Sequence, residues 1–146
     1  MSDWRDNLVT SADGIARVVR ECKRIAVLGI KTEAQRDQPA FYVAEYMARA
    51  GYDIVPVPVY FPEVTRILDR PVHRTVREVT PPVDMVDVFR RPRDIPPHVD
   101  DILAAHPRVV WLQLGIRNEP AAEAFARAGI RVVQDRCLLV EHRRLR

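Results

Sequence analysis

The order of segments in the N-terminal half constrains the fold of this chain more than any other feature. An apolar run at residues 25–28 ends at Gly29, a polar loop covers residues 30–38, and Pro39 opens a segment with helical periodicity. Pro39 suits the first turn of a helix, where the N–H that proline lacks would have no partner. A second apolar run, residues 53–57, follows this helix. The order strand, loop, helix, strand predicts a right-handed βαβ unit with parallel strands.

The loop after the first strand is the place where such a unit binds anions. Backbone N–H groups and the positive end of the helix both point at this loop, so a phosphate is its expected occupant. Lys31 and Arg36 add positive charge, and each either contacts a phosphate or remains solvated. The loop begins Gly29-Ile30-Lys31-Thr32, which lacks the glycines of GxGxxG and therefore disfavours dinucleotide binding of the usual kind.

The rest of the chain alternates strands and helices. Further strands are expected at residues 83–89, 109–115 and 130–133, and further helices at residues 11–22, 96–105 and 118–128. This alternation predicts an α/β fold, namely a three-layer, doubly wound, mostly parallel sheet of the Rossmann-like kind, with its ligand at the carboxyl ends of the strands. We expect a single domain over residues 1–146, with the N-terminal helical segment, residues 1–22, packing on it.

The connection between the second and third strands interrupts this alternation. Prolines punctuate residues 58–71, where a short helix is expected at residues 63–68. Residues 72–80 are expected to form a short strand and a turn.

Composition and charge restrict the classes of function. The net charge of +3 comes from 23 basic and 20 acidic residues, and no basic patch is interleaved with aromatic residues, so no nucleic-acid partner is expected. No apolar run approaches the roughly 20 residues that span a bilayer, and the first residues lack the order of a signal peptide, so we expect a cytoplasmic protein with no membrane partner. The 2 cysteines and the scattered histidines make no metal site.

Three polar residues stand at or near the ends of predicted strands. Arg90 and Arg91 follow the strand of residues 83–89, which places at least one guanidinium over the ligand crevice, unless they pair with a carboxylate such as Asp94. Gln113 lies within an apolar strand, where a buried amide needs hydrogen-bond partners. It either holds neighbouring backbone, which is the interpretation we favour, or faces the ligand cleft.

A thiol near the C-terminus raises the question of catalysis. Cys137 follows the last predicted strand, beside Asp135 if that strand continues, and His142 is near in the sequence. A structural cysteine is nevertheless the commoner role. No set of nucleophile, base and oxyanion-binding groups can be assembled from the sequence.

Several segments together carry a resemblance to a known family. They are Val27-Leu28-Gly29, the helix start at Pro39, residues 51–57, residues 83–91, residues 110–117 with Trp-Leu-Gln-Leu-Gly, and Asp135-Arg136-Cys137-Leu138. In these segments the chain resembles the small stand-alone CoA-binding proteins, which are similar to the CoA-binding domain of the succinyl-CoA synthetase α subunit. The resemblance runs from about residue 16 to the C-terminus.

The resemblance implies that coenzyme A is held through its adenosine and pyrophosphate. The residues implied to meet the pyrophosphate are Gly29, Ile30, Lys31, Pro39 and Ala40, those that flank the adenosine are Val57 and Pro58, and those that close the site are Phe89, Arg90 and Arg91. Thr32 and Gln113 complete the expected set. Gln38 stands where the family commonly has arginine, and Arg36 is expected to substitute for it.

The function predicted from the sequence is therefore binding of CoA or an acyl-CoA without catalysis. One alternative is a CoA- or thiol-linked enzyme or redox sensor that uses Cys137. Another is an NAD(P)-binding Rossmann domain, which the missing glycines and the absence of an acidic residue after Val57 disfavour. Protein partners, a second copy of the chain included, are left open.

Overall fold

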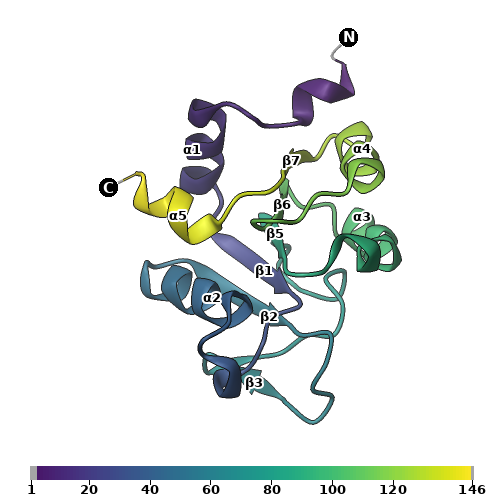
Figure 1. Cartoon of the computed structure of the whole chain (residues 1–146). Helices are drawn as coiled ribbons and strands as arrows, with labels where there is room; N and C mark the ends of the chain where they lie inside the picture. The colour runs from purple at the N-terminus through teal and green to yellow at the C-terminus, as the bar shows by residue number, and fades with distance from the viewer. Residues whose placement is uncertain (1–2, 146) are drawn as a thin grey trace.

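A five-stranded sheet separates two layers of helices in the computed structural model, which describes residues 3–145 (Figure 1). The strands are β1 Arg24–Leu28, β2 Asp53–Val57, β5 Met85–Val88, β6 Val109–Leu112 and β7 Arg131–Val133, and their spatial order is β2-β1-β5-β6-β7. All neighbouring strands in this sheet are parallel. The expected doubly wound, Rossmann-like α/β fold is confirmed. Met1, Ser2 and Arg146 of the expected domain lie outside the described residues.

The helices cover both faces of the sheet. Helices α1 Ala12–Glu21, α2 Pro39–Arg49 and α5 Leu138–Arg143 lie on one face, and α3 Val99–Ala105 and α4 Glu119–Arg127 lie on the other (Figure 1). Four short 3-10 segments are Trp4–Asn7, Glu33–Gln35, Pro92–Asp94 and Pro96–His98. On the first face Phe41 of α2 packs in one core with Trp111 of β6, and on the second Phe125 of α4 packs with Ile102 of α3. None of the helices in the described part of the chain is long and apolar enough to cross a membrane.

Local sequence signals explain where the helices begin and end. The Ser11 side chain accepts a hydrogen bond from the Gly14 N–H at 3.0 Å and caps α1, and the Asn118 side chain caps α4 in the same way through Ala121. Gly51, with φ +99°, ends the turn after α2 in a left-handed conformation that suits glycine. The βαβ unit therefore forms where Pro39 and Gly51 predict it.

The strand order places a crevice at one edge of the sheet. Strand β1 lies between β2 and β5, with Leu28 aligned to Val57 on one side and to Val88 on the other. The connections after β1 and β5 therefore leave the sheet in different directions at its carboxyl edge. In doubly wound sheets such a divergence opens the ligand crevice.

The connection between β2 and β5 differs from the sequence-based expectation. The predicted helix at residues 63–68 is wrong, because strands β3 Arg66–Ile67 and β4 Arg70–Pro71 form a small antiparallel hairpin there. The strand predicted within residues 72–80 is also absent from the described chain. The guanidinium of Arg74 donates to the carbonyl oxygens of Phe61 at 2.9 Å and Val64 at 2.8 Å. The Arg74 side chain therefore orders this connection. An arrangement of this kind gives the sequence neither helical nor strand periodicity.

The C-terminal region also differs in three ways. Strand β6 ends at Leu112, so Gln113 follows the strand instead of lying inside it. Strand β7 ends at Val133 and Asp135 has φ +59°, so the strand does not continue to bring Asp135 and Cys137 onto one side. Helix α5, which the sequence pattern does not predict, begins directly after Cys137.

Candidate functional site

Gly29 is the point where three strand ends meet. Its N–H donates to the Val57 carbonyl at 2.9 Å, and the Phe89 N–H donates to the Leu28 carbonyl at 2.9 Å. Gly29 has φ +88°, and a Cβ atom built on it would collide with the Phe89 carbonyl oxygen. Only glycine allows the loops after β1 and β5 to approach so closely. The crevice therefore requires glycine at position 29.

The loop after Gly29 is tied to the first turn of α2. Ile30 is buried at 1% exposure, and the Lys31 N–H donates to the Ala40 carbonyl at 3.1 Å. The Thr32 hydroxyl is used inside the loop, where it donates to Gln35 Oε1 at 2.8 Å and accepts from the Ala34 N–H at 3.2 Å. The loop is therefore ordered by its own contacts, and the Lys31 side chain extends from it toward the rings of Tyr60 and Phe61.

Two cations converge on one exposed aromatic ring. The Lys31 ammonium nitrogen lies 5.3 Å from the centre of the Tyr60 ring, and the Arg90 guanidinium carbon lies 5.5 Å from it. Arg90 also donates to the Tyr60 hydroxyl at 3.4 Å, which lowers the pKa of Tyr60. Tyr60 is 52% exposed. We call Lys31, Tyr60 and Arg90 the charged cluster; it brings the loops after β1, β2 and β5 together.

The two arginines after β5 have different partners. Arg90 Nε–H donates to His98 Nε2 at 3.2 Å, and burial together with the nearby guanidinium lowers the pKa of His98, so the imidazole acts as a neutral acceptor. Arg91 donates to Asp94 Oδ2 at 2.8 Å, and this hydrogen bond lowers the pKa of Asp94. The expected ion pair with Asp94 is thus made by Arg91, while Arg90 remains directed at Tyr60.

Arg36 lies apart from this cluster. Its guanidinium is 3.8 Å from Glu45 Oε2, and its central carbon lies 5.8 Å from the centre of the Phe41 ring. Arg36 therefore lies along helix α2. Val57 is fully buried and Pro58 is buried beside it, so neither side chain is exposed at the crevice.

A pocket of about 470 Å³ adjoins the charged cluster between the start of α2 and the start of α5. It is lined by Gln38, Pro39, Ala40, Tyr42, Phe89, Arg90, Arg91, Pro92, Gln113, Leu114, Gly115, Ile116 and Cys137. Six of the residues expected from the sequence are in this lining, namely Pro39, Ala40, Phe89, Arg90, Arg91 and Gln113. The Gln38 side chain does not cap α2, so the Ala40 N–H has no hydrogen-bond acceptor in the described chain. This amide and the helix dipole favour a negative charge at the mouth of the pocket.

A buried polar pair lies beside the pocket. Gln113 is 3% exposed, and its Nε2–H donates to Asp87 Oδ1 at 2.8 Å. Asp87 is 1% exposed, and its Oδ2 has no hydrogen-bond partner among the described residues. Burial raises the pKa of Asp87 to about 7, against the opposing effect of the Gln113 hydrogen bond. The favoured interpretation that Gln113 holds backbone is wrong, because its side-chain partner is a carboxyl group.

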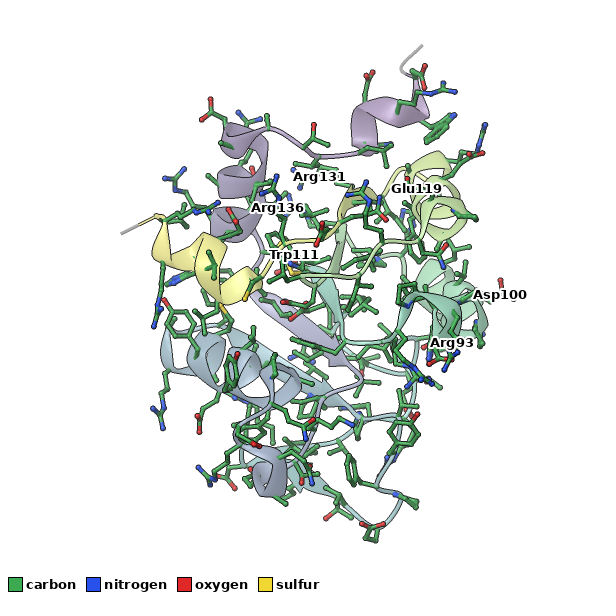
Figure 2. All side chains as sticks on the ribbon, viewed as in Figure 1. Arg93, Asp100, Trp111, Glu119, Arg131 and Arg136 are labelled. Atoms are coloured by element: carbon green, nitrogen blue, oxygen red, sulfur yellow. The ribbon has the colours of Figure 1, made fainter. Side chains whose placement is uncertain are left out.

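The thiols differ in their surroundings. Cys137 lines the pocket, and the Trp111 Nε1–H donates at 2.8 Å to the carbonyl of Arg136, which fixes the segment before the thiol. Trp111 lies near the middle of the molecule, whereas Arg93 and Asp100 lie at its periphery on the α3 side (Figure 2). Cys22 is fully buried, and burial raises its pKa to about 11. No cluster of metal-ligating side chains occurs within residues 3–145.

Comparison with known proteins relates this site to a family. The model of the CoA binding domain family matches residues 23–143. The uncharacterized protein YneT of Bacillus subtilis (strain 168) is 32% identical over 128 residues, which are 88% of this chain and 91% of YneT. A solved structure of a Thermus thermophilus protein is 36% identical, with a TM-score of 0.84 over 94% of this chain and 100% of the other.

A larger enzyme contains the same fold. The dinucleotide-forming acetyl-coenzyme A synthetase 1 of Ca. Korarchaeum cryptofilum matches 75% of this chain, with a TM-score of 0.63 and 14% identity. The match covers 25% of the synthetase chain. At this identity the likeness concerns the fold alone.

Proposed function

Because the chain belongs to the CoA-binding domain family, we propose that it binds coenzyme A or an acyl-CoA at the carboxyl edge of its sheet, without catalysis of its own. The observation that carries this proposal is the convergence of Lys31 and Arg90 over a crevice whose floor requires Gly29. A close backbone approach, two cations and an uncapped helix start are the groups that a pyrophosphate needs.

The phosphates are assigned to the region between the loop and α2. The Ala40 N–H supplies a neutral donor, and Lys31 and Arg90 supply charge. Gly29 and Ile30 contribute the close backbone approach, since the Gly29 N–H is already used by the Val57 carbonyl. Each charge-assisted hydrogen bond stabilises the complex by about 1.5 to 3 kcal/mol. Thr32 supports the loop through its own hydrogen bonds, so its role is to shape the phosphate site rather than to contact the ligand.

The adenosine is assigned to the β2 side of the charged cluster. Val57 and Pro58 are buried at the end of β2 there, and the exposed Tyr60 ring follows them in the chain. An exposed aromatic face suits a purine ring, which stacks on it, while Val57 and Pro58 hold the segment that carries Tyr60. Arg36 is bound to Glu45 on α2, so we assign it no phosphate contact.

A second candidate function rests on the thiol that lines the pocket. Cys137 lies in the same pocket as Gln113 and Arg91, so a thiol-linked enzyme or redox sensor that uses Cys137 is the alternative. A Cys137→Ser protein that keeps full activity, together with a wild type that forms no mixed disulfide with CoA, would exclude it.

Thermal unfolding with three ligands tests the primary proposal. Ligand at about 100 times its Kd stabilises a protein by about 2.7 kcal/mol, which raises Tm by several degrees. CoA is expected to raise Tm more than dephospho-CoA and far more than NAD. Arg127→Ala, which removes an exposed arginine on α4, is the control and is expected to leave the shift unchanged. Absence of a shift with CoA would refute the proposal.

A further inference from the structure

Gln113 is held so that one end of its amide faces the pocket. Its Nε2–H is used by Asp87 Oδ1, while its Oε1 accepts no hydrogen bond from the described chain. Asp87 Oδ2 and His73 Nδ1 are fully enclosed and have no partner among the described residues. Oε1 of Gln113, which also has no partner there, is not fully enclosed. Since Gln113 lines the pocket, its remaining exposure is to the pocket. The carbonyl oxygen is therefore an acceptor offered to a ligand.

Asp87 determines this orientation. A carboxylate oxygen only accepts, so the amide end in contact with Asp87 Oδ1 is the NH₂ group and not the carbonyl. Asp87 Oδ2 has no partner among the described residues, so a proton on this carboxyl group can occupy Oδ2 and leave the contact between Oδ1 and Gln113 in place. Val27 and Trp111, the residues aligned with Asp87 on β1 and β6, have apolar side chains facing the same core. No competing acceptor is therefore supplied by the aligned residues, and the amide stays in one orientation.

The chemistry of the pocket selects what can lie against Gln113. A phosphate at neutral pH offers mainly acceptor oxygens, so it gains nothing from a carbonyl oxygen. The remainder of the lining is largely apolar, with Phe89, Leu114 and Ile116 among its members. A fitting ligand segment is therefore uncharged, mostly apolar, and carries an N–H or O–H donor.

The pocket shares its mouth with the phosphate region. Ala40 and Arg90 line the pocket, and both also belong to the groups assigned to the phosphates. A ligand whose phosphates lie at this mouth can extend an uncharged arm into the pocket. The pantetheine arm of CoA is such a segment, with two amide N–H groups, a hydroxyl group and a dimethyl carbon.

We propose that this pocket binds the pantetheine arm of CoA and that the Gln113 carbonyl oxygen, positioned by Asp87, accepts a hydrogen bond from it. This inference rests on the proposed CoA binding and adds to it a residue that recognises the arm. Gln113 would then distinguish CoA from nucleotides that carry the same phosphates without an arm. Asp87 is a positioning residue, because it acts through Gln113.

The test compares CoA with its nucleotide half, 3′-phosphoadenosine 5′-diphosphate, by isothermal titration. Gln113→Met is expected to weaken CoA binding about five- to tenfold, which corresponds to one neutral hydrogen bond, and to change binding of the nucleotide half less than twofold. Equal losses for both ligands, or no loss for either, would overturn the inference. If the wild type binds neither ligand, the proposed function itself fails. If the wild type binds the nucleotide half as tightly as CoA, only the arm pocket fails.

Two variants of Asp87 test the positioning role. Asp87→Asn keeps an acceptor oxygen for the Gln113 amide and is expected to retain the preference for CoA over the nucleotide half. Asp87→Leu removes the acceptor and is expected to reduce this preference as Gln113→Met does. Unchanged binding of the nucleotide half shows that each variant is folded. A preference that survives Asp87→Leu would overturn the positioning role.

Discussion

The two halves of the carboxyl edge are built on different principles. The charged cluster is open, with Tyr60 at 52% exposure between Lys31 and Arg90, whereas the pocket beside it places Gln113 at 3% exposure. Exposed charges act at a distance and are screened by salt, while an enclosed hydrogen bond acts only on a ligand that fits. Under the proposed function, the first half would supply affinity for phosphates and the second would supply selectivity for the group that the phosphates carry.

Gly29 joins the two halves, so its replacement should damage both. Gly29→Ala adds a Cβ that collides with the Phe89 carbonyl in addition to the cost of φ +88°. The expected loss is at least about 4 kcal/mol of unfolding free energy, or failure to fold. Gly129→Ala is the matched control, because Gly129 has φ +86° with open space around it, and should cost only about 1 kcal/mol. Urea unfolding of both variants measures the difference, and equal losses would contradict the close approach.

Asp87→Asn, which changes the buried polar pair beside the pocket, should alter the pH dependence of the unfolding free energy. The folded pKa of Asp87 is raised from 3.8 to about 7, so the folded state retains a proton that the unfolded state releases between these values. The wild type therefore loses stability from this group as pH rises from 4 to 7, by up to about 4 kcal/mol at about 1.4 kcal/mol per pKa unit.

The measurement is the difference in unfolding free energy between variant and wild type at pH 4, 5, 6, 7 and 8. The advantage of Asp87→Asn should grow up to about pH 7 and then remain level, because Asp87 is ionised in both states of the wild type above that pH. Taking the difference cancels the carboxylates that titrate in both proteins. A difference that does not vary with pH would contradict the raised pKa.

Arg90→Ala should separate the charged cluster from the pocket. Loss of one charge-assisted contact is expected to weaken CoA binding about 10- to 100-fold at low salt and to make the remaining affinity less dependent on salt. Lys31→Ala should act in the same direction with a smaller effect, because Lys31 binds phosphate as a point charge. Titrations at two salt concentrations measure both quantities. An Arg90→Ala protein with unchanged affinity would remove the charged cluster from the site.

Thiol labelling gives the smallest expected effect and reports on the pocket. Cys137 lines the pocket and should react with iodoacetamide, whereas Cys22 is fully buried with a pKa raised to about 11 and should not react in the folded protein. Saturating CoA should slow the reaction of Cys137 several-fold by filling the pocket. Mass spectrometry of the labelled chain measures the rate at each cysteine, and labelling that CoA does not slow would place the arm elsewhere.

The sequence predicts the parts of the fold that depend on local signals. Pro39, the Ser11 and Asn118 caps and the left-handed Gly51 mark helix ends within a few residues, so the βαβ unit follows from them. The hairpin at residues 66–71 was not predictable in this way, because Arg74 organises that connection through carbonyl groups 10 to 14 residues earlier.

The site contains residues that sequence reasoning could not assemble. Asp87 and Gln113 come together because β5 pairs with β6 in one register, and pairing between distant strands is not encoded in local periodicity. A single acidic residue within an apolar strand was the available signal for Asp87. Arg36 is a different case, since its place in the loop suggested a phosphate contact, and the structure places its guanidinium 3.8 Å from Glu45 Oε2 on the adjacent helix. A phosphate contact of Arg36 stays a prediction.

Chemical-shift mapping with ¹⁵N-labelled protein and CoA tests the central claim most directly. CoA is expected to shift the backbone amides of Gly29, Lys31 and Ala40 together with the side-chain amide of Gln113. Arg127 on α4 should not respond. Shifts confined to the amino ends of the strands, or no shifts at millimolar CoA, would contradict CoA binding at the carboxyl edge.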